Sequence, residues 1–404
     1  MWSYFKFEIK QFFTNKKNLA IYFLLAFATL FYAFKIAPTY NPIESVDYDE
    51  IEARYLTRQE FLDHMEGSDL NGVHPSVIYA IGIFKEINPI DKKRLDALDE
   101  GDLKQYADLT RDWYYFTNSF TYRNEAFFSY NSKYFIENNK YAEDDAFYAY
   151  LEQAVRYDAY SKADYELSLD IFEQRTALQT FERLSKGLLP IILIVCVLLL
   201  SIDIVKKDQR HPSILKGFPI SDWKKLLVKM FVALLGSVAL FAPLLIGFFI
   251  IGLQFGFGNF NLPSPMYAAQ LDWHLEGQFE MMTLGTFIVQ SLTLLFTWFI
   301  VIISVVLLCS ILFRSEMVNF AVGLLLIFGE NFYASRYVGY FWDVQNYPTS
   351  YIQVGQIISK RRNFYYMNNN LDFTLGLQLL FGLAGVVILL MIVIALNKRY
   401  KLMK

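Results

Sequence analysis

The sequence predicts an all-α integral membrane protein, with six transmembrane helices and a mostly helical extracellular domain inserted between the first two. Composition is the first reason: 54% of the 404 residues are hydrophobic and 19% are charged, whereas soluble proteins carry about 25% charged residues. The second is that apolar residues gather in runs close to the roughly 20 residues that cross a bilayer. The third is charge partition. Residues 41–180 hold 28 acidic and 14 basic residues, a net charge of −14, and the rest of the chain holds 12 acidic and 23 basic residues, a net charge of +11.

Six apolar runs are expected to cross the membrane. Lys35 lies near the outer end of the first run, where its long side chain can reach the interface. Pro243 predicts a kink in the third run, because proline has no N–H to donate within a helix. The fourth run is longer than a bilayer requires and predicts a tilted helix, and the fifth is the shortest. The runs cover residues 19–37, 186–205, 226–255, 282–313, 317–333 and 374–396.

Lysine and arginine residues near the ends of these runs predict the orientation. Residues 1–18, the loop 206–225 and the tail 397–404 are basic, and with six spans they fall on one side of the membrane. Because positive loops mark the cytoplasm, both termini are expected there. The sequence therefore predicts a multi-pass protein of a bacterial plasma membrane.

The acidic insert 38–185 and the loops 256–281 and 334–373 are then expected outside. One observation argues against this arrangement, because the last of these loops is itself basic. Its basic residues are Arg336, Lys360, Arg361 and Arg362. The three basic regions on the other side outnumber it.

The first 18 residues predict a basic amphipathic helix. Its apolar residues recur at near-helical spacing beside lysines, and they are Trp2, Phe5, Ile9, Phe12 and Phe13. Such a pattern suits a helix that lies among the inner lipid headgroups; the alternative is a snorkelling start to the first span. No small-residue cleavage site follows the first run, which predicts an uncleaved anchor rather than a signal peptide.

Residues 38–185 are expected to form the extracellular helical domain. Between Asp102 and Phe120 apolar residues follow helical spacings of three and four. The run from Asp144 to Lys186 contains neither proline nor glycine, and we expect one long helix there that continues into the second span. The domain's negative charge would attract cationic amphipathic molecules such as antimicrobial peptides, with its many tyrosines as an adaptable surface. The alternative is that these tyrosines pack the core and that an outer domain needs no lysine or arginine.

The sequence offers little sign of catalysis. It contains no GxxxxGK[ST] phosphate loop and no HExxH motif, and its four histidines are scattered, so the chain is not expected to bind ATP itself or to be an enzyme. Cys196 and Cys309 lie inside apolar runs and are interpreted as small buried hydrophobes. The basic residues form no dense stripe, which argues against nucleic-acid binding. Glu330 and Asn331, in the outer half of the fifth run, are a candidate intramembrane polar site; the alternative is a carboxylate at the outer interface that pairs with an arginine such as Arg336.

The loop 206–225 predicts a short helix on the cytoplasmic face. Pro212 can open this helix and Gly217 can end it. Ser221 or Asp222 can cap the next helix, which becomes the third span. Exposed apolar residues on a short charged loop indicate a protein partner, and here they are Ile214, Leu215 and Phe218.

This loop resembles the coupling-helix region of ABC transporter permeases of the type-2 exporter class. Those permeases show a charged pair after span two, a short helix ending in Gly-x-Pro-hydrophobic-Ser, an aromatic residue and a lysine that enters span three. The matching positions are Lys207-Asp208, Ile214-Leu215, Gly217-Phe218-Pro219-Ile220-Ser221, Trp223 and Lys229. Two further stretches resemble their interfacial elbow helix and the Asn-Pro-x-x-Tyr stretch before their last span: Phe7-Glu8 with Asn15-Lys16-Lys17-Asn18, and Asn346-Tyr347-Pro348-Thr349-Ser350-Tyr351, in which Tyr347 separates the Asn from the Pro.

The resemblance implies a permease subunit of an ATP-driven exporter that moves an amphipathic peptide, lipid or drug outward. It also implies a second permease copy or a paralogue, and a separate cytoplasmic ATPase subunit that holds ATP and magnesium, with no cofactor on this chain. The residues implied to couple to that ATPase are Arg210, His211, Ile214, Leu215, Lys216, Phe218 and Pro219. The large insert departs from the smallest family members and leaves the substrate open. The alternatives are a membrane sensor or accessory subunit with a ligand-binding outer domain, and an intramembrane enzyme.

Overall fold

The computed structural model describes the chain except residues 43–44, 123–129, 208–217, 269–278 and 397–404. It is mostly helical and divides into two compact units. The first unit comprises Met1–Thr39, Thr180–Phe257 and Gly285–Lys404, and the second comprises Tyr40–Gln179 and Gly258–Leu284. The second unit therefore contains most of the predicted insert 38–185 together with most of the loop 256–281, which the sequence had suggested to be a separate element.

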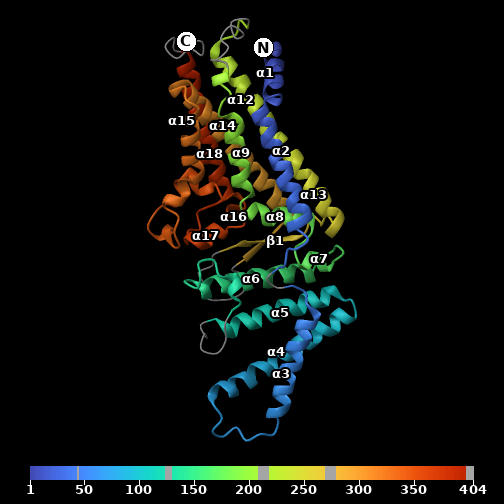
Figure 1. Cartoon of the computed structure of the whole chain (residues 1–404). Helices are drawn as coiled ribbons and strands as arrows, with labels where there is room; N and C mark the ends of the chain where they lie inside the picture. The colour runs from blue at the N-terminus through green and yellow to red at the C-terminus, as the bar shows by residue number, and fades with distance from the viewer. Residues whose placement is uncertain (43–44, 123–129, 208–217, 269–278, 397–404) are drawn as a thin grey trace. The chain divides into compact units, whose positions relative to one another are not determined.

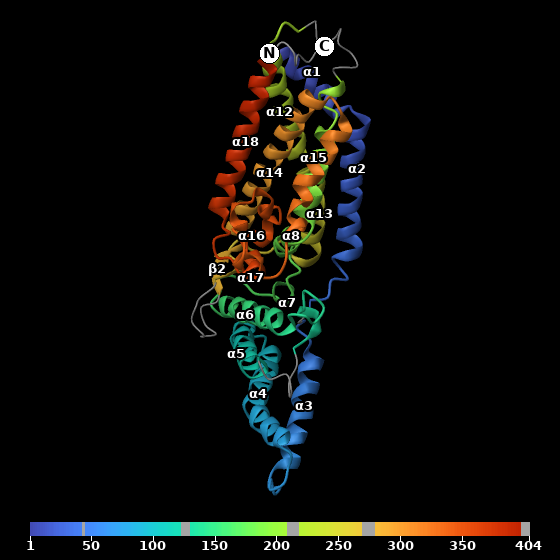
Figure 2. The same cartoon turned by 90° about the vertical axis from the view of Figure 1, so that its left-hand side faces the viewer.

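The first unit is a bundle of apolar helices that lie side by side (Figure 1 and Figure 2). Among the described residues, four helical segments are long and apolar enough to cross a membrane, consistent with a multi-pass membrane protein. They are α2 (Lys16–Phe31) with its π-helical continuation η1 (Tyr32–Ile36), α12 (Asp222–Ala239) with α13 (Phe241–Phe255), α14 (Leu284–Phe313) and α18 (Phe373–Leu396). The α14 helix is the most buried of the four, whereas α2 and α18 bury only a minority of their residues, as helices that face lipid would.

The predicted count of six spans is not confirmed. Both α9 (Leu189–Ser201) and α15 (Glu316–Phe328) have 13 residues, fewer than the roughly 20 that a crossing needs. The α9 helix follows residues 169–186 after a break at which the chain bends by 70°, and a fifth span results only if that bent pair is counted as one. The predicted kink in the third run agrees with an interruption of regular helix at Leu240, since Pro243 has no N–H to donate to the carbonyl of Ala239.

The segment between α15 and α18 folds into short helices against the bundle. These are η3 (Gly329–Phe332), η4 (Val338–Tyr340), η5 (Val344–Asn346), η6 (Pro348–Tyr351), α16 (Val354–Ile358) and α17 (Arg361–Tyr366). Tyr351 is fully buried, and its carbonyl accepts a hydrogen bond of 2.9 Å from Trp298 Nε1 of α14. Gly376 of α18 leaves room for the Tyr351 ring. The stretch that resembles Asn-Pro-x-x-Tyr is therefore packed between two of the long helices.

The second unit is built from four longer helices, α3 (Tyr48–Met65), α4 (Pro75–Asp99), α5 (Leu103–Thr121) and α6 (Ala142–Ser161) (Figure 1). Its core is aromatic: Trp113 and Tyr114 of α5 pack against Tyr150 and Tyr157 of α6, and all four side chains are buried. For Tyr114, Tyr150 and Tyr157 the interpretation as core residues is therefore correct.

The expected long helix from Asp144 to Lys186 is wrong. The α6 helix ends at Ser161, and two shorter helices follow, α7 (Leu169–Phe172) and α8 (Ala177–Lys186). The Ser168 side chain caps α7 by accepting from the N–H of Ile171, and the Tyr160 ring packs on Phe172 at 5.5 Å. Because a cap and a tertiary contact end the helix, the absence of proline and glycine did not predict its length.

The expectation of an all-α fold also misses a small sheet. Strands β1 (Pro263–Tyr267) and β2 (Phe279–Thr283) pair antiparallel, with Pro263 opposite Thr283 and Tyr267 opposite Phe279. The sheet is joined to α6, because Arg156 Nη1 donates a hydrogen bond of 3.1 Å to the Pro263 carbonyl. Strand alternation was hard to recognise in five-residue segments next to long apolar runs. A short 3-10 helix, η2 (Ser132–Tyr134), completes the unit.

Candidate functional site: the attachment of the 208–217 segment

The candidate site lies at one end of the first unit, around the segment of residues 208–217. Five of the seven predicted coupling residues fall inside that segment and so lie outside the described residues: Arg210, His211, Ile214, Leu215 and Lys216. Phe218 and Pro219 are described. The structure also describes both ends of the chain that carry the segment, and these ends define the geometry of the site.

The N-terminal helix α1 (Trp2–Phe13) packs along α12. It buries Tyr4, Glu8 and Phe12, while Trp2 on another face is 65% exposed. The Phe12 ring occupies the space beside Gly236 of α12 that a larger residue would fill. One face of the predicted amphipathic helix is thus used for protein packing, and an exposed aromatic residue remains on another.

A buried ion pair joins α1 to α12. A Glu8 carboxylate oxygen accepts a hydrogen bond of 2.8 Å from Lys229 Nζ, and the two side chains are 3% and 0% exposed. The same ammonium donates to the carbonyl of Ile204 at 3.1 Å and lies 5.9 Å from the centre of the Tyr4 ring. Removing two charges from water is costly unless they are paired and hydrogen-bonded, and here both conditions are met. Lys229 therefore ties together α1, α12 and the chain after α9.

A second ion pair fixes the chain just before the 208–217 segment. Asp203 accepts a hydrogen bond of 2.6 Å from Lys17 at the start of α2, and lies 3.2 Å from the ammonium of Lys207. Lys17 Nζ also donates to the carbonyl of Leu199 in α9. The Asn15 side chain caps α2 by accepting from the Lys17 N–H, which holds Lys17 at this position.

Phe218 fixes the chain just after the segment. Its half-buried ring lies 5.2 Å from the Tyr4 ring and 5.6 Å from the Phe7 ring, both on α1. Pro219, the next residue, is exposed. The sequence predicted that Phe218 contacts a partner protein. In the structure, part of its ring contacts α1 of the same chain.

The described residues on both sides of the 208–217 segment are bound to the helix bundle. The upstream side is bound to α2 and α9, and the downstream side is bound to α1 and leads into α12. The residues that flank the segment thus contact or lead into four helices, α1, α2, α9 and α12. Within the described part of the chain, no group of three histidine, cysteine, aspartate or glutamate residues is placed to hold a metal ion.

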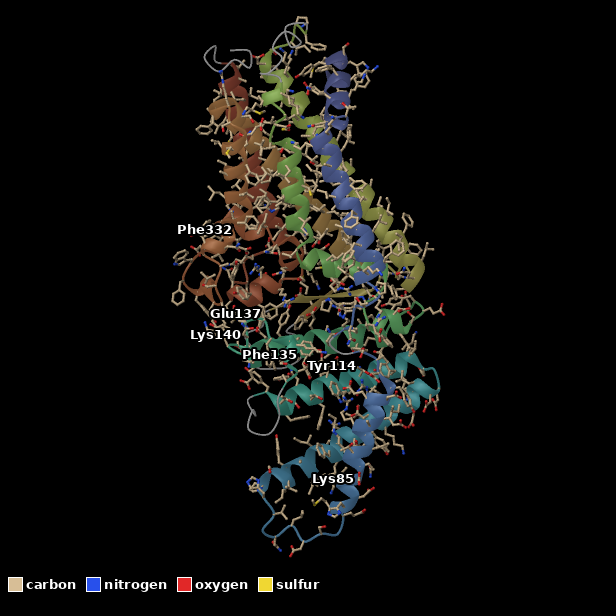
Figure 3. The ribbon with its side chains drawn as sticks, viewed as in Figure 1. Lys85, Tyr114, Phe135, Glu137, Lys140 and Phe332 are labelled. Carbon is tan, nitrogen blue, oxygen red and sulfur yellow. The ribbon has the colours of Figure 1, made fainter. Side chains whose placement is uncertain are left out.

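At the candidate polar site, Glu330 forms an ion pair with Arg362. Glu330 is buried, and its carboxylate accepts hydrogen bonds from Arg362 Nη2 at 3.2 Å and from the Tyr366 hydroxyl at 2.6 Å. Burial, with the nearby carboxylate, raises the pKa of Tyr366 and keeps it a donor. Asn331 is exposed, as is Phe332, whose side chain projects from the edge of the ribbon (Figure 3).

The interpretation of Glu330 as a carboxylate paired with an arginine is thus correct in kind, but the partner is Arg362 rather than Arg336. The guanidinium of Arg336 instead lies 4.5 Å from the Phe364 ring centre. Two of the four basic residues that argued against the orientation are therefore partnered inside a folded segment. Such partnered residues are weaker evidence about sidedness than freely solvated ones.

Sequence reasoning missed three residues of the main site. Lys17 was counted as a positive charge and placed in the stretch that resembles the elbow helix but was given no partner, Asp203 was given no role, and Tyr4 was not noted. A usable signal was present: Glu8 is the one acidic residue among the first 18, and Lys229 lies inside an apolar helix. Isolated opposite charges in apolar surroundings favour burial as a pair.

A comparison with known protein families, with curated proteins and with solved structures finds no match for this chain.

Proposed function

We propose that this chain is the membrane-spanning permease subunit of an ATP-driven exporter of the ABC type. A separate nucleotide-binding subunit would bind ATP and magnesium, and a second copy or a paralogue of this chain would complete the transport pathway. The transported molecule would be amphipathic. The apolar helix bundle supports a multi-pass membrane protein, and the sequence motifs around residues 206–225 support the class.

The observation that carries the proposal is the attachment of both ends of the 208–217 segment. Asp203 is bound by Lys17 on the upstream side, and Phe218 packs on Tyr4 on the downstream side. A coupling element must transmit the movement of a partner to the spanning helices. It does so only if no flexible hinge at its ends takes up that movement. The Lys17–Asp203 ion pair before the segment and the ring packing of Phe218 after it support that requirement.

We also propose that α9 and α15 complete six spans, with both termini in the cytoplasm and the second unit outside. The two short helices lie beside the longer ones in both views (Figure 1 and Figure 2). Asn319 of α15 donates a hydrogen bond of 2.8 Å to the carbonyl of Ile202, just after α9. Irregular backbone at membrane depth is tolerated where protein covers it. A short helix that is extended by non-helical turns could therefore still cross the membrane within the bundle.

Substitution within the segment tests the proposal. Leu215→Asp places a charge where an apolar partner contact is expected, and burial of a leucine is worth about 1.5–3 kcal/mol. We expect the variant chain, expressed with the ATPase encoded beside it, to lose co-purification of that ATPase or to uncouple its hydrolysis. Ser213→Asp is the matched control, because it adds the same charge at a polar position of the same segment.

Normal ATPase binding and wild-type transport by Leu215→Asp would rule out this segment as the coupling element. If the wild-type chain itself purifies with no ATPase, a sensor or accessory subunit becomes the better interpretation of its outer domain.

A further inference from the structure

The second unit contains an unusual concentration of positive charge within an acidic domain. Asp91 of α4 is fully buried, and three guanidinium groups surround it. Arg54 binds it in a bidentate manner at 3.0 and 3.1 Å, Arg58 at 2.9 Å and Arg94 at 2.9 Å. These four bonds occupy the roughly four acceptor positions of one carboxylate. One negative charge therefore faces three positive charges.

The surplus charge is not removed by other carboxylates around the cluster. Glu50 lies 3.7 Å from Arg54, but its side chain is 68% exposed, and an exposed pair at that distance contributes little. Arg94 uses two further donors on Thr110 and on the Tyr106 hydroxyl. Arg58 makes no further hydrogen bond within the described part of the chain. Burial lowers the pKa of Arg58 to about 10; Asp91 partly opposes this shift, and the neighbouring arginines add to it.

The two less saturated arginines border a groove of about 540 Å³ between α3 and α4. Arg54 and Arg58 lie along one part of it together with the exposed Glu50, which leaves that part with a net positive charge. Phe61 and Phe84 form another part as an edge-to-face pair at 5.5 Å. The Arg58 guanidinium lies 5.4 Å from the Phe84 ring centre, so the cationic and aromatic parts of the groove are continuous. Guanidinium groups offer paired donors that match phosphate and carboxylate oxygens.

We infer that this groove binds an anionic amphiphile, with its phosphate or carboxylate head on Arg54 and Arg58 and its apolar part on Phe61 and Phe84. An incoming anion would neutralise the surplus charge beside Asp91, and the aromatic rings would bury the apolar part. The net charge of the domain favours cationic ligands, but the local charge at this groove has the opposite sign. The inference does not depend on the proposed transport function, because it concerns binding alone.

Ligand binding to the full chain, reconstituted in phosphatidylcholine nanodiscs, tests the inferred anionic site. The probes are octyl phosphate, octyltrimethylammonium and inorganic phosphate, titrated by calorimetry against empty nanodiscs to remove partition into lipid. We expect saturable binding of octyl phosphate, no competition by the cationic probe, and at least tenfold weaker binding of inorganic phosphate. Octanoate in place of octyl phosphate distinguishes a carboxylate head from a phosphate head.

Arg58→Gln is the decisive variant, and Arg111→Gln is its control on α5, away from the groove. Removing Arg58 leaves Asp91 with two arginines and reduces mutual repulsion, so the variant should melt no lower than the wild type. We expect it to bind octyl phosphate at least tenfold more weakly, with Arg111→Gln unchanged. Unchanged binding by Arg58→Gln, or equal binding of the cationic probe or of inorganic phosphate, would overturn the inference.

Discussion

Glu8 and Lys229 are separated by 221 residues in the sequence, and their side chains form one buried ion pair at 2.8 Å. The pair joins the first helix of the chain to the helix that follows the 208–217 segment. Since Lys229 also binds the Ile204 carbonyl, the same ammonium reaches the chain on the other side of that segment. Helix α1, which comes before all the spanning helices in the sequence, is thus part of the region that we propose to couple to a partner.

Breaking this pair on one side should destabilise the first unit strongly. Glu8→Leu leaves the Lys229 ammonium buried without its carboxylate, a loss of about 3–5 kcal/mol. We expect a lower melting temperature of the detergent-solubilised protein. Lys10→Leu is the control, because Lys10 is exposed on the same helix.

The double variant Glu8→Leu/Lys229→Met separates charge from packing. It replaces both charges with apolar groups of similar size and should melt well above Glu8→Leu alone. A double variant as unstable as the single one would contradict a specific ion-pair interaction and indicate lost packing instead.

The proposed orientation predicts a pattern of cysteine labelling in intact cells. In a background in which Cys196 and Cys309 are replaced by alanine, an impermeant maleimide should modify Asp99→Cys and should not modify Ser213→Cys or Lys401→Cys. All three should react after the cells are opened. Labelling of Ser213→Cys in sealed cells would reject the arrangement, because that position belongs to the proposed inner surface.

Asp91 should be essential for the fold of the second unit. Asp91→Asn removes the single negative charge among three buried or half-buried arginines, and we expect a cost of about 3–5 kcal/mol. Limited proteolysis of the full chain should then cut within α3 to α5 at protease concentrations that leave the wild type intact. Asp96→Asn, at an exposed position of the same helix, should behave as the wild type does, and equal resistance of both variants would refute the prediction.

The long apolar helices and the helical insert were predictable because hydrophobic runs and helical spacing are local properties of sequence. The end of α6 at Ser161 was not, since it depends on the Tyr160–Phe172 contact. Pairing of Glu330 with Arg362 rather than with the nearer Arg336 likewise depends on how the intervening segment folds. A residue type and its spacing can indicate that a buried charge needs a partner, but tertiary structure decides which partner it receives.

At the candidate site, too, single residues could be recognised from the sequence but their contacts could not. The motif residues Glu8, Lys229 and Phe218 were recognised one by one, but a linear sequence does not say that the first two meet or that Phe218 packs on α1. Contacts across more than 200 residues depend on how the bundle closes, which charge and hydropathy patterns leave undetermined.

Gly355 should tolerate no side chain. It lies in α16, where a Cβ atom would fall 2.6 Å from the backbone nitrogen of Lys186 and even closer to the Ser185 carbonyl oxygen. Backbone atoms cannot move aside as a flexible side chain can, and the neighbouring Gln356 holds the two segments together with a hydrogen bond of 2.9 Å to the Lys186 carbonyl. Gly355→Ala should therefore push α16 away from the end of α8.

We expect Gly355→Ala to cost about 1–3 kcal/mol, the usual range for overpacking, measured as a lower melting temperature in detergent. Gly382→Ala provides the matched control, because no atom lies within 4 Å of its added Cβ and alanine is favoured over glycine within a helix by about 1 kcal/mol. The same chemical change should thus destabilise the protein at one glycine and stabilise it at the other. If both variants shift the melting temperature in the same direction, the close approach of α16 to α8 is not a determinant of stability.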